Sequence, residues 1–458
     1  MSKHPDAGQR VLWLSFPFPP AVSAGVFRSL RFVRYLPDHG WNPVVLTVRP
    51  DEGFPVDESL NDLLSEPVTV RQSAYWRPDR WPNRLPGRRR RQPGLPATAV
   101  PAPGSSGADA ADDPPASRPS RLRILRDRIL ATPDPKIWWA IPSFWPALRM
   151  IRRYSPTIIF STAPPHSSHL LALWLKRVTR LPVVLDFRDP WARSPWTEGR
   201  HDCLATANQR LERRCVRGAD AVILNTQMAR EEFLRHYGKR YADRFYTIPN
   251  GFDPAMRERV AALSTGEPAA PDPATPFRIC HVGTLYGRRE IRPLIRAVAR
   301  LAAKGHDIRL EQVGMVKVDY DLPAFVSDLG LGDHVRITPP VPHAEALRRM
   351  AMADALLLVQ PESGLQVPGK LYEMLLFRKP VIGLTGEGET REIVRKYHLG
   401  PVADPADEAA IATAIGGLLA SDTGEQTDWA AVQAAFDGRN QAGQLAGIFD
   451  KLSRPASN

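Results

Sequence analysis

Two segments of the sequence place arginine or lysine beside a glycine, a combination that can bind phosphate. In one of them, Gly283 and Thr284 follow an apolar run, and Arg288 and Arg289 come a few positions later. A glycine at a helix start lets backbone N–H groups approach an anion, and a guanidinium group binds phosphate through two parallel hydrogen bonds. We therefore predict that this segment contacts a phosphate group.

The other segment, residues 361–373, has the most specific pattern in the chain. Gly369 and Lys370 begin a predicted helix after another apolar run, so backbone donors and an ammonium group gather at the positive end of the helix. Glu373 lies one turn later, where a carboxylate can accept two hydrogen bonds from a vicinal diol such as ribose. Glu362 stands earlier in the same loop. The segment predicts a nucleotide-binding site.

Polar side chains also follow apolar runs in the first half of the chain. Gly25 opens a predicted helix after the first run, which again favours contact with a phosphate. His166 and His169 follow a second run, and either imidazole can orient or deprotonate a hydroxyl group. Asp186 ends a third run, and it either takes part in chemistry or pairs with charged neighbours in its own loop.

Short apolar runs that alternate with helical patterns must position these residues. Most of the runs are continuous rather than alternating, as in parallel strands buried on both faces. They form two series, 11–16, 43–48, 157–161, 183–187, 221–225 and 245–248, then 277–282, 308–313, 335–338, 355–359 and 381–384. Alternating strands and helices predict an α/β protein with two doubly wound parallel-sheet domains.

The two series divide the chain into domains. We expect an N-terminal domain over residues 1–255, a linker over 256–276 rich in Pro, Ala and Asp, a C-terminal domain over 277–428, and a helical segment over 429–458. Ligands of such domains bind where the strands end. The cleft between the domains is therefore the expected site.

Composition and motifs exclude several classes of protein. The chain has 458 residues, 43% of them hydrophobic, and only three cysteines, too few for a disulfide framework. The few scattered cysteines favour a reducing, cytoplasmic location. We expect neither a transmembrane helix nor a signal peptide. The sequence patterns of P-loop NTPases, dinucleotide-binding dehydrogenases, serine hydrolases and zincin metalloproteases do not occur.

The positive charge is concentrated in one fifth of the chain. The net charge is +12, and residues 71–155 hold 17 Lys and Arg against 6 Asp and Glu, a local charge of +11. Within this block we predict a disordered insertion at about 86–120 and a basic helix at 121–130, and four aromatic residues follow at 138–145. A basic helix beside tryptophans favours an anionic membrane surface, and no nucleic-acid-binding motif accompanies it. A solvated loop followed by an ordinary buried helix is the alternative.

Taken together, these segments resemble the GT-B-fold glycosyltransferases of family four, which use nucleotide-sugar donors and retain the anomeric configuration. The resemblance covers about residues 10–420 except the insertion, and its strongest part is the Gly-Lys-Leu-Tyr-Glu segment at 369–373. The other matching segments are 16–25, 162–166, 186–191, 247–253 and 282–286.

The resemblance implies a role for each segment. Arg289, with Arg288 beside it, would take the place of the family's phosphate-binding lysine, Glu373 would bind the ribose, and the backbone from Gly369 to Leu371 would hold the diphosphate. The loop at Gly25 would close onto the donor from the other domain. No metal or other cofactor is implied. The family often has a glutamate eight positions before the ribose-binding one, where this sequence has Leu365.

We therefore expect a metal-independent, retaining glycosyltransferase. His166, Asp186, Arg289 and Lys370 are its candidate catalytic residues. Its expected acceptor is a glycan or a lipid-linked precursor of a cell-surface polysaccharide, bound on the inner face of the cell membrane. A nucleotide-sugar epimerase of the same fold and a non-catalytic membrane-associated assembly protein are the alternatives, and the residue at position 365 favours the second of these.

Overall fold

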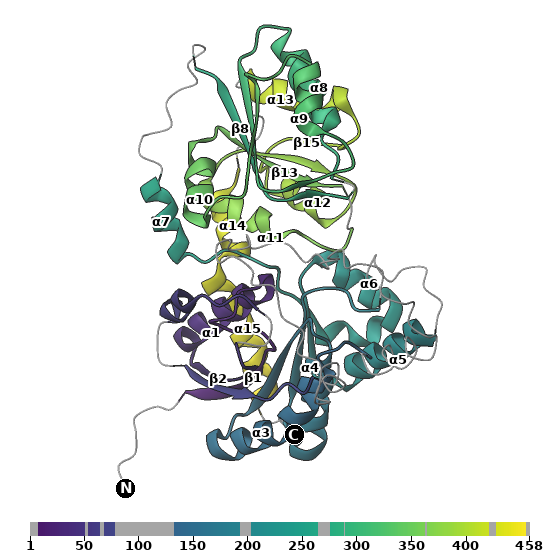
Figure 1. Ribbon diagram of the computed structural model, residues 1–458. Helices are drawn as coiled ribbons and strands as arrows, with labels where there is room; N and C mark the ends of the chain where they lie inside the picture. The colour runs from purple at the N-terminus through teal and green to yellow at the C-terminus, as the bar shows by residue number, and fades with distance from the viewer. Residues whose placement is uncertain are drawn as a thin grey trace, which may run out of the picture. The chain divides into compact units, whose positions relative to one another are not determined.

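The computed structural model describes most of the chain as two compact α/β units (Figure 1). The described residues are 8–50, 54–64, 68–77, 132–192, 203–263, 275–287, 289–361, 364–420 and 427–454. The first unit comprises the described residues before Pro249 together with those from Gln441 onward, and the second comprises Pro249–Asn440. The expected insertion at 86–120 and the expected basic helix at 121–130 lie outside the described residues.

The first unit is built on a seven-stranded parallel sheet with the strand order β3-β2-β1-β4-β5-β6-β7. The central strands are fully buried runs of Val, Leu, Ile and Phe, because helices cover both faces of the sheet. The strands are β1 (Gln9–Leu14), β2 (Trp41–Val48), β3 (Thr69–Ser73), β4 (Ile158–Ala163), β5 (Val183–Phe187), β6 (Ala221–Leu224) and β7 (Phe245–Thr247).

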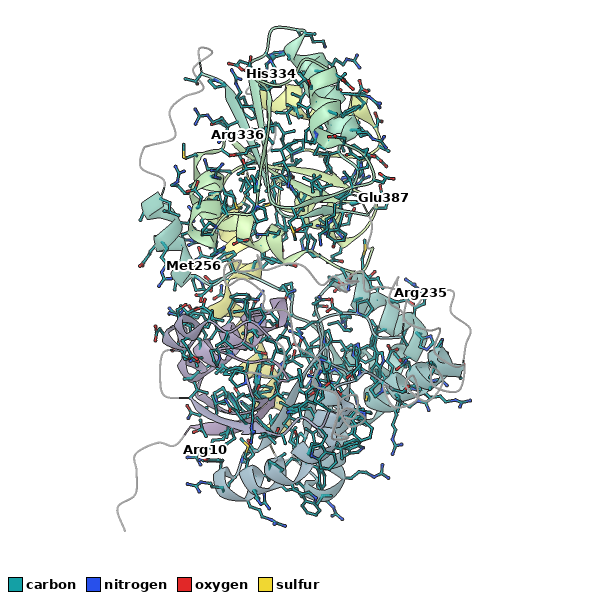
Figure 2. The ribbon with its side chains drawn as sticks, in the orientation of Figure 1. Arg10, Arg235, Met256, His334, Arg336 and Glu387 are labelled. Atoms are coloured by element: carbon teal, nitrogen blue, oxygen red, sulfur yellow. The ribbon has the colours of Figure 1, made fainter. Side chains whose placement is uncertain are left out.

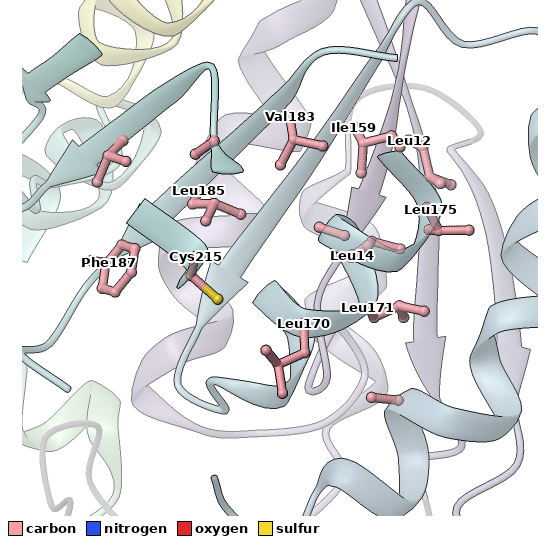
Figure 3. Close-up of a cluster of buried hydrophobic side chains, with 14 of the residues drawn as sticks. Leu12, Leu14, Ile159, Leu170, Leu171, Leu175, Val183, Leu185, Phe187 and Cys215 are labelled. Carbon is pink, nitrogen blue, oxygen red and sulfur yellow. The ribbon is translucent and has the colours of Figure 1, made fainter. Parts of the chain in front are cut away.

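Two hydrophobic clusters fix the helices to the two faces of this sheet. On one face the aliphatic side chains of β1, β4 and β5 pack against α4 and α5, with Leu171 and Cys215 among the fully buried residues (Figure 3). On the other face Trp13 and Phe160 pack with Phe449 near the C-terminus. The helices of this unit are α1 (Ala24–Tyr35), α3 (Ile137–Tyr154), α4 (Ser167–Thr179), α5 (Cys203–Gly218) and α6 (Gln227–Tyr237), and its 3-10 turns are η1 (Leu36–His39), η2 (Glu58–Leu63) and η4 (Lys239–Arg244).

The second unit has a six-stranded parallel sheet with the order β12-β10-β8-β13-β14-β15, beside a two-stranded pair, β9 and β11. The strands are β8 (Phe277–Val282), β9 (Leu285–Tyr286), β10 (Ile308–Val313), β11 (Val316–Lys317), β12 (Val335–Thr338), β13 (Ala355–Gln360), β14 (Val381–Thr385) and β15 (Val402–Ala403). The helices are α7 (Ala255–Leu263), α8 (Arg292–Ala302), α9 (Leu322–Asp328), α10 (His343–Met352), α11 (Gly369–Met374), α12 (Glu389–Lys396), α13 (Glu408–Leu419) and α14 (Trp429–Phe436), and η5 (Leu375–Phe377) continues α11.

These two sheets confirm the predicted fold class of two doubly wound parallel-sheet domains. Each expected apolar run lies on a strand, with ends that differ by at most two residues. Four strands were not predicted: the edge strands β3 and β15 and the two-residue pair of β9 and β11. All four are short and have few fully buried residues, so their hydrophobic pattern is weak.

Two segments depart from the expected domain plan. The segment expected as a linker from residue 256 begins with α7, whose Val260 is buried in the core of the second unit. The expected C-terminal helical segment divides between the units: α14 belongs to the second, whereas most of α15 (Gly438–Ser453) packs on the first. Trp41 Nε1 donates to Asp450 Oδ1 at 2.9 Å, and its ring contacts Phe449 edge-on.

Candidate functional site

The strand order places the candidate residues of each unit at one edge of its sheet. In the first unit the order reverses between β1 and β4, and in the second between β8 and β13. Parallel sheets bind ligands at the carboxyl ends of strands beside such a reversal. Gly25 and His166 follow β1 and β4, while Arg289 and Lys370 follow β8 and β13. Sequence reasoning therefore selected the edges that the topology favours.

Asp186, at the end of β5, is enclosed in a hydrogen-bonded cluster. Arg28 of α1 donates to both of its carboxylate oxygens, Nε to Oδ2 at 3.0 Å and Nη2 to Oδ1 at 2.8 Å, and Thr162 Oγ1 donates to Oδ2 at 2.8 Å. Arg28 also donates to the carbonyl of Ile248. The side chain of Asp186 is 1% exposed, so it ties α1, β4 and β5 together. This geometry assigns Asp186 a positioning role in place of the direct catalytic role expected from the sequence.

His169 lies inside the first unit. Its Nδ1 lies 2.9 Å from Ser161 Oγ, and its ring contacts that of Phe187. Burial and the Arg188 guanidinium lower the pKa of His169 to about 3. The residue is fully buried and neutral near pH 7, which indicates a structural role.

His166 begins α4 and is the more accessible of the two histidines. Its ring stacks on Trp191 with a centroid distance of 4.5 Å and an interplanar angle of 3°. Its Nδ1 is buried and has no hydrogen-bond partner among the described residues. Burial, His169 and Arg188 hold the pKa of His166 well below its ordinary value. A neutral imidazole in a fixed orientation at the edge of the sheet can accept a proton from a hydroxyl group.

Gly25 lies directly against the guanidinium group of Arg188. A Cβ atom at position 25 would stand 2.0 Å from Arg188 Nη1. A side chain at this position would therefore collide with a buried arginine. The glycine has a packing requirement that the sequence analysis, which considered only an approaching phosphate, did not identify.

Arg289 of the second unit is held by weak contacts. Its Nη1 donates to the carbonyl of Thr284 at 3.2 Å and its Nη2 to Gln360 Oε1 at 3.3 Å. The guanidinium lies 4.5 Å from the ring centroid of Tyr286. Both acceptors are neutral, and among the described residues no carboxylate pairs with this guanidinium. Arg288 lies outside the described residues.

Lys370 and Glu373 pair with each other on α11. Lys370 Nζ lies 3.0 Å from Glu373 Oε2, and His343 Nε2 lies 3.7 Å from Glu373 Oε1. The side chains are 14% and 18% exposed, so a ligand can reach both. Leu371 directs its side chain into the hydrophobic core, which leaves only its backbone for a ligand. Glu362 lies outside the described residues.

His281, buried near the end of β8, was not selected from the sequence. Its Nδ1 bonds to Gln312 Oε1, and Gln312 Nε2 donates to the carbonyl of Gly283 at 2.8 Å. Burial lowers the pKa of His281 to about 4; the Gln312 hydrogen bond opposes this shift, and the charges of Arg289 and Lys370 add to it. Arg289 follows β8 and bonds to Gln360, the last residue of β13, so it lies at the end of the strand that leads to Lys370. No local sequence signal reveals this role, because Gln312 lies on another strand.

The structure brings Gly283, Thr284, Arg289, Gly369, Lys370, Leu371 and Glu373 to one edge of the second unit, at the ends of two adjacent strands. Gly25, His166 and Asp186 occupy the corresponding edge of the first unit. Within the ranges that the structure describes, no group of three or more His, Cys, Asp or Glu side chains is arranged to hold a metal ion.

Comparison with known proteins follows this division into two units. Residues 100–256 match the family model described as Glycosyltransferase Family 4, and residues 276–421 match that of the Glycosyl transferases group 1. The chain belongs to the GT-B glycosyltransferases of family four. The resemblance noted in the sequence is thereby confirmed, and the two parallel-sheet domains are the GT-B architecture.

The relatives are distant. A GDP-mannose-dependent alpha-(1-6)-phosphatidylinositol monomannoside mannosyltransferase from Mycolicibacterium smegmatis is 30% identical over 45% of this chain and 55% of its own length. A D-inositol 3-phosphate glycosyltransferase from Paenarthrobacter aurescens is 28% identical over 32% of this chain and 36% of its own. The chain thus matches about a third to a half of the length of these relatives.

Solved structures match over nearly the whole chain and share its fold. Anabaena Alr3699/HepE in complex with UDP has a TM-score of 0.58 at 17% identity, over 97% of this chain and 100% of that one. Sucrose-phosphate synthase from Thermosynechococcus elongatus has a TM-score of 0.58 at 16% identity, over 97% and 99%.

Proposed function

We propose that this family-four protein transfers a sugar from a nucleotide-sugar donor to a hydroxyl group of a glycan or lipid-linked acceptor. The observation that carries the proposal is that Arg289 and the pair of Lys370 and Glu373 follow two adjacent strands, β8 and β13, at the strand reversal of the second unit. This arrangement combines two cations for a diphosphate with a carboxylate for a ribose diol. The solved structure of Alr3699/HepE with bound UDP supports a uridine nucleotide as the first donor to test.

The pair formed by Lys370 and Glu373 can exchange partners when a donor binds. Ribose hydroxyls would take the place of the ammonium group on Glu373, and Lys370 would turn with Arg289 toward the diphosphate. When the glycosidic bond breaks, negative charge develops on the leaving diphosphate, and these two cations stabilise it. We propose that transfer proceeds without a metal ion and with retention of configuration, as the family resemblance implies.

His166 is the proposed residue for the acceptor hydroxyl. It is neutral near pH 7 because burial disfavours its charged form, and stacking on Trp191 fixes its ring. An oriented neutral imidazole can accept a hydrogen bond from the attacking hydroxyl group. The proposed role of Asp186 is to hold the strands that present His166.

Product analysis tests the proposed activity. The full-length protein is incubated with UDP- and GDP-sugars and with lipid or glycan acceptors, and products are identified by mass spectrometry with and without EDTA. We expect glycosylated acceptor and free nucleoside diphosphate, with no effect of the chelator. An epimerised donor without any acceptor would favour the epimerase. No nucleoside diphosphate binding in a thermal-shift screen would favour the non-catalytic assembly protein.

We also propose that α3 contacts an anionic membrane surface at the cytoplasmic face. One stripe of this helix exposes Ile141 and Trp145, 39% and 65% exposed, followed by Arg149 and Arg152. Apolar side chains beside arginines are typical of interfacial helices. The relative whose name includes phosphatidylinositol monomannoside supports a lipid acceptor. Among the described residues, no helix has the length and hydropathy to cross a bilayer.

Vesicle sedimentation tests this contact. We expect binding to vesicles with anionic lipid, reduced by Trp145→Ala and by the double change of Arg149 and Arg152 to Glu, and weakened by salt. Arg336→Glu, on an exposed position of the second unit, is the matched control (Figure 2). Equal binding of the unmodified protein to neutral and anionic vesicles would contradict the proposal.

A further inference from the structure

Arg188 is a buried arginine that bonds to main-chain carbonyls of the loop that leads to His166. It follows β5 directly and is 7% exposed. Its Nε donates to the carbonyl of Ala163 at 3.0 Å, and its Nη2 donates to the carbonyl of Pro164. Its backbone N–H also donates to Ala163 at 3.1 Å. Three hydrogen bonds thus tie the end of β5 to the last residue of β4 and to the residue that follows it.

The main chain of Arg188 is fixed from the other side as well. Asn225, at the end of β6 and 5% exposed, donates from Nδ2 to the Arg188 carbonyl. Arg188 therefore connects the carboxyl ends of three adjacent strands, β4, β5 and β6. A lysine donates from a single nitrogen and lacks the planar fork through which the guanidinium bonds to two successive carbonyls from Nε and Nη2.

The remaining edge of the guanidinium faces α1. Nη1 is buried without a hydrogen-bond partner in the described part of the chain. A Cβ at position 25 would lie 2.0 Å from Nη1 and 2.7 Å from both Cζ and Nη2. Real Cβ atoms do not approach other heavy atoms this closely, so any residue larger than glycine displaces the guanidinium group.

We propose that Arg188 is the positioning residue for His166, and that position 25 is a glycine because the Arg188 guanidinium occupies the space of a side chain there. The inference rests on the proposed function, since it assigns to His166 the contact with the acceptor. It differs from the phosphate role that the sequence suggested for Gly25. Loss of either residue would release the same loop.

The charge of Arg188 has a second effect at this loop. The charged and titratable groups around His166 are His169, Arg188 and Asp134, and the Asp134 carboxylate accepts the backbone N–H of His166. Arg188 opposes protonation of both imidazoles. Removal of its charge therefore raises the pKa of His166, whereas Arg188→Lys retains the charge and loses the bonds to the two carbonyls.

A double-mutant cycle tests the link between positions 25 and 188. The variants are Gly25→Ala, Arg188→Ala and the double variant, measured by kcat/KM for transfer and by thermal unfolding. We expect Gly25→Ala to lower kcat/KM by at least about tenfold in the original background and by less than about twofold in the Arg188→Ala background. An equal loss in both backgrounds would assign the glycine to the donor and overturn the inference.

A second measurement needs no activity. The pKa of His166 is followed by NMR with isotope-labelled histidine in the original protein, in Arg188→Ala and in Arg188→Lys. We expect the pKa of His166 to rise in Arg188→Ala and to stay near its original value in Arg188→Lys. In Arg188→Lys we also expect a lower kcat with an unchanged KM for the donor. Arg235→Ala, an exposed arginine on α6 (Figure 2), is the control. If the His166 resonance is unchanged in both Arg188 variants, the inference is overturned, whether or not transfer activity is found. If the His166 pKa shifts as expected but no transfer occurs, only the proposed function is contradicted.

Discussion

The two units place charged residues at equivalent edges of their sheets but surround them differently. In the first unit, the side chains of Arg28 and Asp186 are 3% and 1% exposed, and every oxygen of the carboxylate is bonded within the protein. In the second unit, Lys370 and Glu373 are 14% and 18% exposed and bond mainly to each other. At the edge of the first unit the charged groups are already bonded within the protein. At the edge of the second unit the charged groups remain accessible for a ligand to bind.

This difference has a physical basis. A fully buried ion pair has lost its water, so removal of one member leaves an uncompensated charge in a medium of low polarity. A partly exposed pair can be separated by a ligand at small cost, because water or the ligand replaces each partner. The buried pair of the first unit therefore fixes the positions of the loops, whereas the partly exposed pair of the second unit can exchange its partners for a ligand.

The largest expected effect comes from removing the charge of the buried carboxylate in the first unit. Asp186→Asn leaves Arg28 buried without its counter-charge, and we expect a loss of about 3–5 kcal/mol in the free energy of unfolding. Urea denaturation measures it. In contrast, the exposed pair of Arg235 and Glu232 should contribute less than about 1 kcal/mol, measured with Arg235→Ala. Similar small losses for both variants would mean that the first unit is not held by this cluster.

One buried histidine in each unit should make the free energy of unfolding depend on pH. The pKa of His281 is lowered to about 4 from an ordinary value of 6.5, so the folded state favours the neutral imidazole. Its stabilising effect is complete above pH 6.5 and is lost as the pH falls toward 4, at about 1.4 kcal/mol per pH unit. The pKa of His169 is about 3, so this residue also reduces the free energy of unfolding as the pH falls, and its effect extends below pH 4.

The variant His281→Gln should flatten part of this pH dependence, and His306→Gln, at an exposed position, is the control. Unfolding free energies from pH 7.5 down to about pH 4 give the slope directly. An unchanged slope in His281→Gln would show that the pKa of this imidazole is the same in the folded and unfolded protein, and would contradict its burial beside the donor site.

The smallest effect on folding is expected from substitutions at the partly exposed edge of the second unit. Glu373→Ala and Arg289→Ala should each lower kcat/KM by at least about tenfold, because each removes one charge-assisted bond worth roughly 1.5–3 kcal/mol. Their unfolding free energies should change by less than about 0.5–1 kcal/mol, as for other half-exposed positions. Arg336→Ala is the matched control, since its side chain is 75% exposed. Near-normal turnover in both variants would remove the donor site from this edge.

Sequence reasoning succeeded where the information is local. Continuous runs of Val, Leu and Ile predicted the central strands, and the spacing of Lys370 and Glu373 placed both on one turn of a helix, where they pair at 3.0 Å. It failed where partners are distant. Arg28 and Asp186 are 158 positions apart, and nothing near either residue specifies the other. The link between Gly25 and Arg188, and the return of α15 to the first unit, are equally nonlocal.

Local patterns along the chain were enough to predict the two α/β domains and the family, because hydrophobic periodicity and short motifs depend on neighbouring residues. Which charged groups are enclosed and which stay accessible depends on how distant segments fold together. Crossover helices bring the ends of β1, β4 and β5 to one edge from distant parts of the chain. Burial there encloses Asp186 and Arg188 in hydrogen bonds that hold the site, since a carboxylate or guanidinium without water must be satisfied by the protein around it.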